Sequence, residues 1–395
     1  MPHPAPPRRS ALDARLNKRC KAAWHAGATD RLPFSGATDK APPMDALVTP
    51  SPEAPSSEAL AEIDRLMARG ASFFGSRYAL LGGAMSWVSE RHLVAALSNA
   101  GAFGVIACGA MEPDRLAQEI AGTQALTAKP FGVNLITMHP RLEALVDVCL
   151  AAGVSHIVFA GGIPPGSAIK RAKEGGARIV CFAPALALAK KLVRSGADAL
   201  VIEGSEAGGH IGPVSLNVLA QEILPHVTEV PVFVAGGIGR GEAILSYLEM
   251  GAAGAQLGTR FVCATECVAH PNFKRAFIRG SARDALPTVQ IDPRFPVIPV
   301  RALQNGGTQR FMEHQAATLA RFQSGELSKD AAQLDIEHFW AGALRRAVVD
   351  GDVENGSLMA GQSVGMVTRE QPAAEIVAEL IAQAARALSA RRGWR

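Results

Sequence analysis

The sequence predicts an α/β protein of 395 residues: a (β/α)8 TIM barrel with a C-terminal helical cap and a disordered N-terminal tail. Short apolar strands alternate with amphipathic helices from about residue 78, and eight such strands can be counted. Each strand is apolar on both faces, as a parallel strand covered by helices must be. The main alternative is an open doubly wound sheet. Against it, no Gly-x-Gly-x-x-Gly follows the first strand, and Gly237, Gly239 and Gly241 have the wrong spacing for a dinucleotide fingerprint.

Apolar runs, helical periodicity and glycines at helix ends place the repeating elements. The strands are predicted at Tyr78–Gly82, Phe103–Ala107, Phe131–Leu135, Ser155–Ala160, Ala177–Phe182, Ala199–Glu203, Val232–Ala235 and Gly254–Leu257. The intervening helices include Glu90–Ala100, Pro113–Leu126, Arg141–Ala152, Ala185–Ser195, Leu216–His226 and Gly241–Met250. Several helices are followed by a glycine that suits a left-handed C-cap, namely Gly101, Gly153, Gly196 and Gly251.

Four regions are expected along the chain. Residues 1–57 are rich in Pro, Ala, Ser and Arg without periodicity, which predicts a disordered tail; an organellar transit peptide is the alternative. Residues 58–267 form the barrel. Residues 268–350 are interpreted as a mostly helical cap, with helices over Thr308–Gln323 and Ile336–Val349 and a proline-rich connection over Pro287–Pro299. Residues 351–395 provide a C-terminal turn and a peripheral helix, Ala373–Ala390, that packs on the barrel.

Composition excludes several classes of function. Hydrophobic residues make up 48% of the chain and charged residues 19%, which is typical of a globular protein with a large core. The formal charge of +4 lies mostly in residues 1–40, which hold eight Lys/Arg against three Asp/Glu, so the remainder offers no basic stripe for nucleic acid. The six cysteines are scattered without a Cys-x-x-Cys pair, and no apolar run could span a bilayer. We therefore expect a cytoplasmic protein with free thiols.

Two glycine turns follow the last two predicted strands. Gly236 and Gly237 follow the seventh strand, and Gly258 and Thr259 follow the eighth. In (β/α)8 enzymes these two loops commonly hold a phosphate through backbone N–H groups. The pair therefore predicts a phosphate site, although either turn alone would indicate only a tight turn. Gln256, inside the eighth strand, could be satisfied in the core or could direct its amide at a ring.

Other strand ends also carry candidate binding residues. After the first strand, Gly83 lets the backbone approach a flat ligand and Met85 offers a polarizable contact; a turn with Met85 and Trp87 in the core is an equal alternative. Asn134 lies near the end of the third strand, where its amide needs a partner. That partner is either a neighbouring loop or the polar edge of a ligand.

His210 is the principal catalytic candidate. It follows Gly208 and Gly209 in a glycine-rich loop after the sixth strand, and its near-neutral pKa suits a general base or hydrogen-bond donor. Metal binding with Glu203 and Glu206 is the rival role. The glycines argue against a helix that would hold these side chains on one face, and no His-Glu-x-x-His occurs, so we expect no metal.

Taken together, these motifs resemble the nitronate monooxygenase family, formerly called 2-nitropropane dioxygenases. The resemblance covers roughly residues 75–280 and the turn at 361–365, and its most specific block is Glu-Ala-Gly-Gly-His-Ile-Gly at 206–212. One departure is Gly82, which replaces the glutamine usual at that position. The flavin-dependent enoyl-ACP reductases of bacterial fatty-acid synthesis are similar in the same blocks.

The resemblance implies an FMN-binding barrel in which His210 faces the flavin and serves as catalytic base or positions the nitronate. The positions that match flavin contacts are Gly83, Met85, Asn134, Gly208, Gly209, Gly236, Gly237, Gln256, Gly258 and Thr259. The implied reaction is oxidation of an alkyl nitronate or nitroalkane by O2 to a carbonyl compound and nitrite. The alternatives are an NAD(P)H-dependent enoyl-thioester reductase and a flavin-binding module without turnover. We expect no nucleic-acid or membrane partner. The sequence leaves open whether the protein forms a homo-oligomer.

Overall fold

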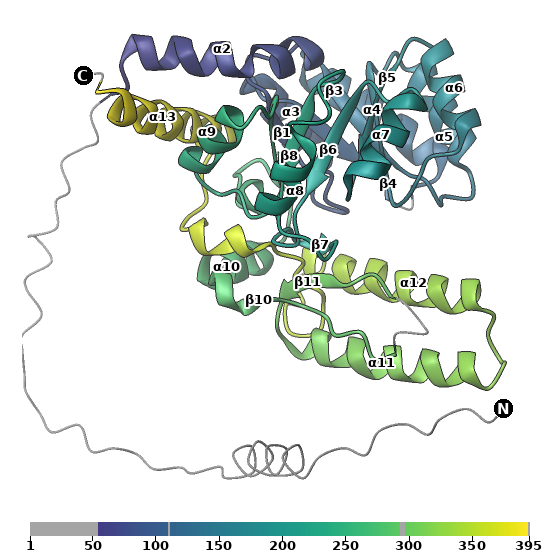
Figure 1. Ribbon diagram of the computed structural model, residues 1–395. Coiled ribbons are helices and arrows are strands. Elements are labelled where there is room, and N and C mark those ends of the chain that lie inside the picture. Colours follow the sequence, from purple (N-terminus) through teal and green to yellow (C-terminus); the bar gives the residue numbers. More distant parts are fainter. Residues whose placement is uncertain (1–53, 110, 293–296, 394–395) are drawn as a thin grey trace, which may run out of the picture. The chain divides into compact units, whose positions relative to one another are not determined.

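The computed structural model describes residues 54–109, 111–292 and 297–393 (Figure 1). Of the predicted tail, residues 1–57, the part from residue 1 to residue 53 lies outside the described residues. At its other end the prediction is wrong by one residue, because Ser57 already begins helix α2, Ser57–Phe74. The Ser56 hydroxyl caps this helix by accepting a hydrogen bond from the Ala59 amide at 3.3 Å.

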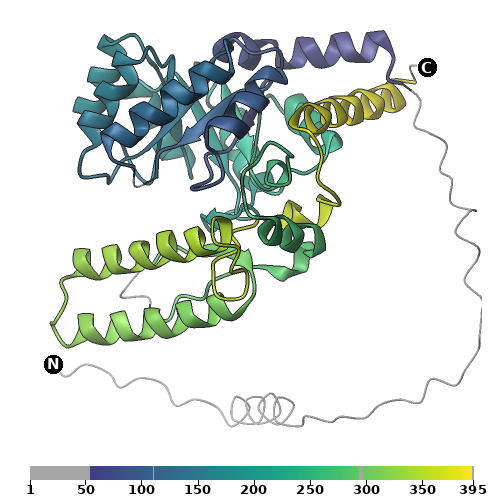
Figure 2. The same ribbon diagram turned by 180° about the vertical axis from the view of Figure 1, so that it is seen from behind.

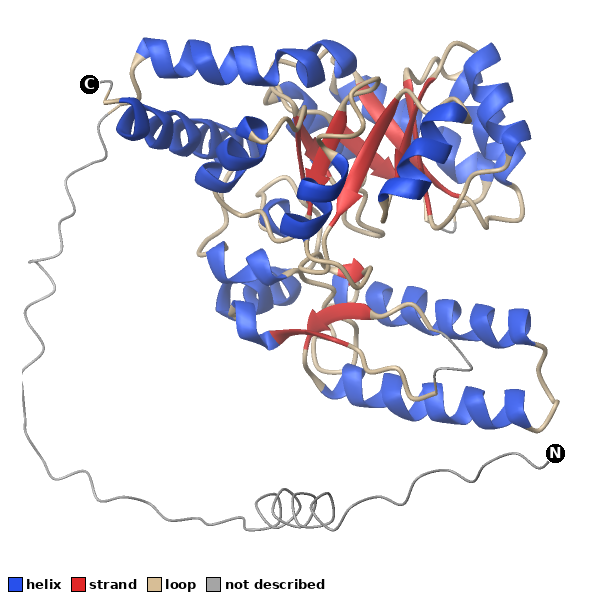
Figure 3. Ribbon diagram, in the orientation of Figure 1, coloured by secondary structure: helices blue, strands red, loops and turns tan. Residues whose placement is uncertain are grey.

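Eight parallel strands form a barrel in the order β1-β9-β8-β6-β5-β4-β3-β2 (Figure 3). They are β1 (Leu80–Gly82), β2 (Gly104–Ala107), β3 (Phe131–Ile136), β4 (His156–Ala160), β5 (Arg178–Phe182), β6 (Ala199–Glu203), β8 (Val232–Ala235) and β9 (Gly254–Leu257). A bridge between Leu81 and Phe103 closes the ring from β1 to β2. When the paired residues of neighbouring strands are followed once around the ring from a residue of β1, the path returns to β1 at a residue eight positions further along the chain. This shift of eight is the stagger of a (β/α)8 barrel. The predicted fold class is confirmed.

Helices follow the strands and cover the outside of the barrel. They are α3 (Arg91–Asn99), α4 (Pro113–Leu126), α5 (Leu142–Ala151), α6 (Gly166–Glu174), α7 (Leu186–Arg194), α8 (Leu216–Ile223) and α9 (Gly241–Glu249). The four predicted cap glycines all have positive φ, from 70° to 105°. The sequence pattern does not predict α6, because this short helix begins with glycine and buries only Ala168, Ile169 and Ala172.

The C-terminal helix α13, Ala373–Arg392, completes the ring of helices. It packs against α9, α2 and α3, and so fills the position of the eighth barrel helix, which the cap separates from β9 in sequence (Figure 2). The approach to α9 is so close that a side-chain carbon at Gly241 would collide with the Leu380 carbonyl oxygen. Ile376, Leu380 and Ala384 are fully buried. The prediction that this helix is peripheral is therefore wrong, and its Ala-rich sequence reflects tight helix packing.

An aromatic cluster fills the amino-terminal end of the barrel. Phe74, at the end of α2, stacks on Phe103 with ring centroids 4.2 Å apart and contacts Phe233 at 4.8 Å and His156 at 5.2 Å. Burial lowers the pKa of His156 to about 4, so this imidazole is neutral at pH 7. The cluster closes the lower end of the barrel and leaves only the carboxyl end of the strands for a ligand.

The region after β9 contains a small sheet as well as helices. Strands β10 (Ala285–Pro287) and β11 (Val300–Leu303) follow α10 (Pro271–Arg279), and they pair antiparallel with β7 (Gly209–His210) in the order β10-β11-β7. The interpretation of 268–350 as mostly helical missed β10 and β11, because the proline-rich connection concealed two short strands. Helices α11 (Gly306–Gln323) and α12 (Lys329–Val348) form an antiparallel pair with its own core of Phe311, Ile336 and Trp340 (Figure 1). Helix α12 begins seven residues earlier than predicted, at the Ser328 cap.

Within the described ranges, no helix is both long enough and apolar enough to cross a membrane. The five described cysteines, Cys108, Cys149, Cys181, Cys263 and Cys267, are buried free thiols, as expected; Cys20 lies outside the described residues. Burial raises the pKa of the Cys108 and Cys181 thiols to about 12, so neither is a thiolate nucleophile at neutral pH.

The aromatic cluster predicts a large stability effect at one position. Phe74→Ala should lower the free energy of unfolding by about 3–5 kcal/mol, because it removes a buried ring from a site that cannot collapse. Leu60→Ala, on the exposed face of the same helix, is the control and should change it by less than about 1 kcal/mol. Urea unfolding followed by circular dichroism would measure both; equal midpoints for the two variants would contradict a closed lower end.

Candidate active site at the barrel mouth

The strand register determines which side chains point into the barrel. The rings of Phe103, His156 and Phe233 all contact the ring of Phe74 although β2, β4 and β8 are not neighbouring strands, so these residues face inward. Register partners of parallel strands share a face, and every second residue along a strand returns to it. By this rule Glu203, paired with Ala235, and Gln256, also paired with Ala235, both face inward.

The stagger arranges these inward residues in layers of four from alternate strands. The uppermost layer, at the mouth, consists of Ala107, Ala160, Glu203 and Gly258. The next layer consists of Gly83, Asn134, Phe182 and Ala235, and below it lie Val105, Val158, Val201 and Gln256. Most positions of the upper two layers are glycine or alanine, and such short side chains suit close contact with a flat ligand.

Three glycine loops and the C-terminal turn meet beside this mouth. A side-chain carbon at Gly208 would lie 2.5 Å from the Gly361 nitrogen, and one at Gly237 would lie 2.9 Å from the Glu206 Cβ. Gly209, Gly236 and Gly237 have φ of 79°, 97° and 69°, which only glycine adopts readily. The Thr259 hydroxyl accepts a hydrogen bond from the Gly361 amide at 2.9 Å. The predicted phosphate-binding residues and the loop that carries His210 are thus neighbours.

His210 lies where the barrel meets the cap. Strand β7 pairs His210 with Val300 of β11, and the His210 Nε2 lies 3.3 Å from Glu337 Oε2 on α12. The imidazole keeps 40% of its side-chain surface exposed and therefore remains available to a ligand. Sequence reasoning missed Glu337, because a glutamate on the exposed side of a helix carries no motif.

The remaining predicted residues lie in the inward layers or in the loop after β1. Asn134 Nδ2 donates to the Val158 carbonyl at 3.0 Å, so its donor group already has a main-chain partner. Met85 approaches Gly258, with its sulfur 3.4 Å from where a Gly258 side-chain carbon would lie. Trp87 is not a core residue: it has φ 67°, is 45% exposed, and has the Arg345 guanidinium of α12 above its ring at 5.9 Å.

Glu203 is a half-buried acid that the prediction of site residues left out. Its carboxyl makes no hydrogen bond or ion pair with any described residue. The residue is half-buried, and loss of solvation raises its pKa to about 8. The signal in the sequence was an acid at the last position of an otherwise apolar strand.

The rival metal role has no support from the contacts of the three residues concerned. Glu206 Oε2 accepts from the Leu216 amide at 3.0 Å and caps the start of α8, while His210 contacts the cap. No cluster of three or more His, Cys, Asp or Glu side chains able to hold a metal occurs within residues 54–393 apart from the undescribed positions. The absence of a resident metal stays a prediction.

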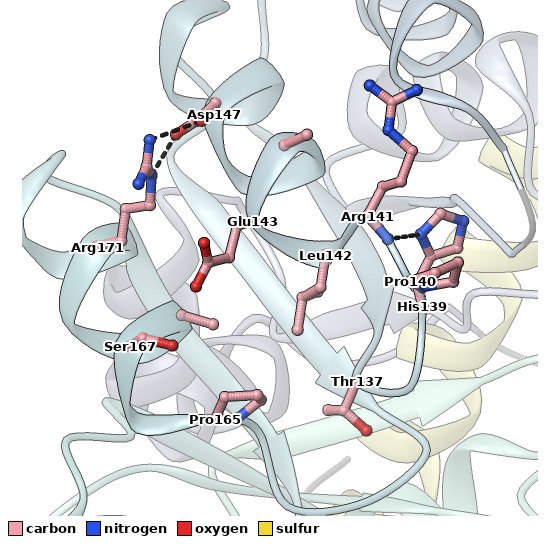
Figure 4. Close-up of a pocket in the computed structure, with 12 residues that line it drawn as sticks. Thr137, His139, Pro140, Arg141, Leu142, Glu143, Asp147, Pro165, Ser167 and Arg171 are labelled. Atoms are coloured by element: carbon pink, nitrogen blue, oxygen red, sulfur yellow. Dashed lines mark hydrogen bonds and ion pairs between the residues drawn. The ribbon is translucent and has the colours of Figure 1, made fainter.

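A separate recess of about 580 Å3 lies on the outside of the barrel between α5 and α6 (Figure 4). Arg171, which pairs with Asp147, lines it together with Arg141 and Glu143. It contains none of the predicted site residues, and its charged, open walls suit solvent better than a flat aromatic ligand. We therefore place the candidate site at the barrel mouth.

The family model described as nitronate monooxygenase matches residues 69–145 and 137–383, which include the whole barrel and the cap. The chain belongs to the nitronate monooxygenase family. Members of this family are flavin-dependent oxidoreductases. The match extends beyond the motifs used above, because it also includes α11, α12 and most of α13.

Relatives within this family differ in their named reactions. The chain is 30% identical over 324 residues to the (3aS,4S,5R,7aS)-5-hydroxy-7a-methyl-1-oxo-octahydro-1H-indene-4-carboxyl-CoA dehydrogenase of Mycobacterium tuberculosis, covering 76% of this chain and 91% of the relative. It is 29% identical over 343 residues to the nitronate monooxygenase of Paraburkholderia phytofirmans, covering 75% and 89%. The structure of FabK from Thermotoga maritima superposes with a TM-score of 0.73 at 34% identity, covering 83% of this chain and 99% of FabK.

The close approach at Gly208 predicts that one methyl group disrupts the mouth of this nitronate monooxygenase family member. Gly208→Ala should weaken flavin binding at least tenfold, because the new Cβ meets rigid backbone at 360–361 and displaces the loop. Gly212→Ala is the matched control, since a Cβ there meets nothing within 4 Å. Titration of each apoprotein with flavin, followed by fluorescence quenching, would distinguish them; equal affinities would contradict the arrangement.

The buried carboxyl of Glu203 predicts a pH-dependent stability. An unfolded glutamate has a pKa of about 4.3, and the folded value is about 8, so the folded state binds more protons between these values. The stability contributed by this group is complete below about pH 4 and is lost as the pH rises through about 8. The melting temperature of Glu203→Gln apoprotein should therefore exceed that of the wild type at pH 8 by more than at pH 5. A constant difference across this range would contradict the raised pKa.

Proposed function

We propose that this protein is an FMN-dependent oxidoreductase whose flavin lies across the barrel mouth. The observation that carries the proposal is the upper end of the barrel, whose two uppermost layers consist mostly of glycine and alanine, next to two glycine loops at the ends of β8 and β9. The backbone amides of Gly236, Gly237, Gly258 and Thr259 would hold the phosphate. The ring would rest over the upper layers, where Gly83 and Ala235 leave space and Asn134 offers a polar edge.

For the substrate, we propose an enoyl thioester carried by coenzyme A or by an acyl carrier protein. The relative from Mycobacterium tuberculosis is a carboxyl-CoA dehydrogenase by name, and FabK is 34% identical, above the identity to the nitronate monooxygenase. Exposed apolar side chains occur in the loops after three of the strands and in the segment between β10 and β11, namely Trp87, Met138, Ile163, Val289 and Ile298. Such residues suit an apolar acyl chain, and a small nitronate would need few of them.

The chemistry divides between the cofactor and the chain. A bound flavin, reduced by NAD(P)H, would supply the hydride that reaches the β-carbon of the enoyl group. The α-carbon then needs one proton, and His210 at the mouth is positioned to hold it. Glu337 Oε2, at 3.3 Å from Nε2, can orient the imidazole. Helix α12 contacts both His210 and Trp87 through Glu337 and Arg345.

Oxidation of an alkyl nitronate by O2 to a carbonyl compound and nitrite is the second candidate. It is supported by the family model and by the 29% identity to the Paraburkholderia phytofirmans enzyme. In that reaction His210 would hold the nitronate or take a proton from the nitroalkane. The two candidates share cofactor and site and differ in the source of electrons.

One pair of assays separates the candidates. Under nitrogen, NAD(P)H should bleach the flavin absorbance at catalytic rates, and addition of an enoyl-CoA should restore it. Under air, propionate-3-nitronate should release little nitrite. Rapid nitrite release without reduction by NAD(P)H would instead establish nitronate oxidation and overturn the thioester proposal.

His210 should be essential to turnover under either candidate. His210→Ala should lower kcat by about 10²–10⁴-fold while leaving flavin content unchanged, because it removes the proton-handling group. His226→Ala, on the outside of the barrel at the end of α8, is the control. Steady-state kinetics on both variants is the measurement; a His210→Ala enzyme with full activity would support the third reading, a flavin-binding module in which this residue is idle.

A further inference from the structure

Glu203 occupies a position that neither proposed reaction uses. It is the last residue of β6, and the register places it in the uppermost interior layer, on the surface over which a ligand in the mouth would lie. The other members of that layer are Ala107, Ala160 and Gly258, whose side chains are too short to cover it. Its carboxyl is therefore the polar group of this layer that a flat ligand meets.

The surroundings of Glu203 provide no charge to balance a carboxylate. The inward residues of the strands on either side, Phe182 of β5 and Ala235 of β8, are apolar, and the polar groups in the layers below are the neutral amides of Asn134 and Gln256. The nearest acid along the chain, Glu206, is directed to the Leu216 amide. Burial is accordingly the sole cause of the raised pKa of Glu203.

Isolated carboxyl groups in such sites are neutral near pH 7 and differ from carboxylates in one useful respect. A protonated carboxyl has an O–H donor, whereas a carboxylate can only accept. A ligand bound in the mouth would shield this donor from water, and a shielded donor without a partner is costly, so a ligand that supplies an acceptor at this place is favoured. The flavin ring carries carbonyl oxygens and unprotonated ring nitrogens that could accept.

Resting on the proposed function, we propose that Glu203 is a positioning residue for the flavin: it is held as the neutral acid in the upper barrel layer and donates a hydrogen bond to an acceptor of the bound ring. The carboxyl thereby fixes the ring over the mouth and sets the electron density of the atom that it contacts. Deprotonation of Glu203 would replace the donor by a negative charge next to the ring, which disfavours the reduced, electron-rich flavin.

The test compares three variants of the full-length chain, loaded with FMN, from pH 6 to pH 9. Glu203→Gln keeps size and a donor but cannot ionise; Glu203→Ala removes both; Glu222→Gln, on the exposed face of α8, is the surface control. The readouts are the dissociation constant for FMN and the midpoint potential of the bound flavin, neither of which requires turnover.

In the wild type, FMN affinity should fall about tenfold and the potential should become more negative as the pH rises through about 8, relative to Glu203→Gln. At pH 6, Glu203→Gln should have the FMN affinity and potential of the wild type. As the pH rises, it should not show the additional fall that the wild type shows. Any pH dependence that remains in Glu203→Gln measures the titration of the flavin itself. Glu203→Ala should bind FMN about tenfold more weakly at every pH.

The outcomes separate this inference from the proposed function. If the wild type binds no FMN, both fail. If it binds FMN, but Glu203→Ala has the wild-type affinity and potential, or the wild type and Glu203→Gln change in parallel with pH, the role of Glu203 is wrong while the proposed function stands. Should Glu203→Ala not fold, the comparison of wild type with Glu203→Gln decides the question alone.

Discussion

Closure of the eight-stranded ladder is the constraint on which the rest of the structure depends. The bridge between Leu81 and Phe103 fixes the stagger, and the stagger fixes which side chains face inward and at which height. Large residues, Phe74, Phe103 and Phe233, then fill the lower end, whereas glycine and alanine predominate at the upper end. A molecule closed at one end and open at the other follows from this distribution.

The small sheet β10-β11-β7 links that open end to the cap. Because β7 consists of Gly209 and His210, the residue expected to handle protons is held in a backbone ladder with β11. Arg301 of β11, a residue that is 7% exposed, donates a hydrogen bond to the Ser205 carbonyl at 3.0 Å. A movement of the cap would therefore alter the position of His210, so the cap participates in the site.

Much of the barrel could be predicted from the sequence, because buried parallel strands and capped helices leave periodic patterns. β6, β8 and β9 have the predicted bounds, and the glycines after helices have the expected positive φ. The close grouping of Gly208, Gly236, Gly237 and Thr259 followed from the rule that strand ends of a barrel converge. Their roles in binding remain predictions.

The features that escaped prediction depend on contacts between distant segments. Glu337 is near His210 only because the fold brings α12 next to β7, and α13 belongs to the barrel only through its contacts with α9, α2 and α3. Strands β10 and β11 are short, and their pairing partner β7 is a two-residue segment inside a glycine loop. Glu203 was visible as an acid at a strand end, but its isolation from charge required the arrangement of all neighbouring strands.

A crystal structure of the protein grown with FMN tests the central claim most directly. The account predicts electron density for the ring over the layer of Ala107, Ala160 and Glu203, with the phosphate between the loops at 236–237 and 258–259. Density for the flavin elsewhere, for instance in the recess between α5 and α6, or a mouth filled by protein side chains, would contradict it.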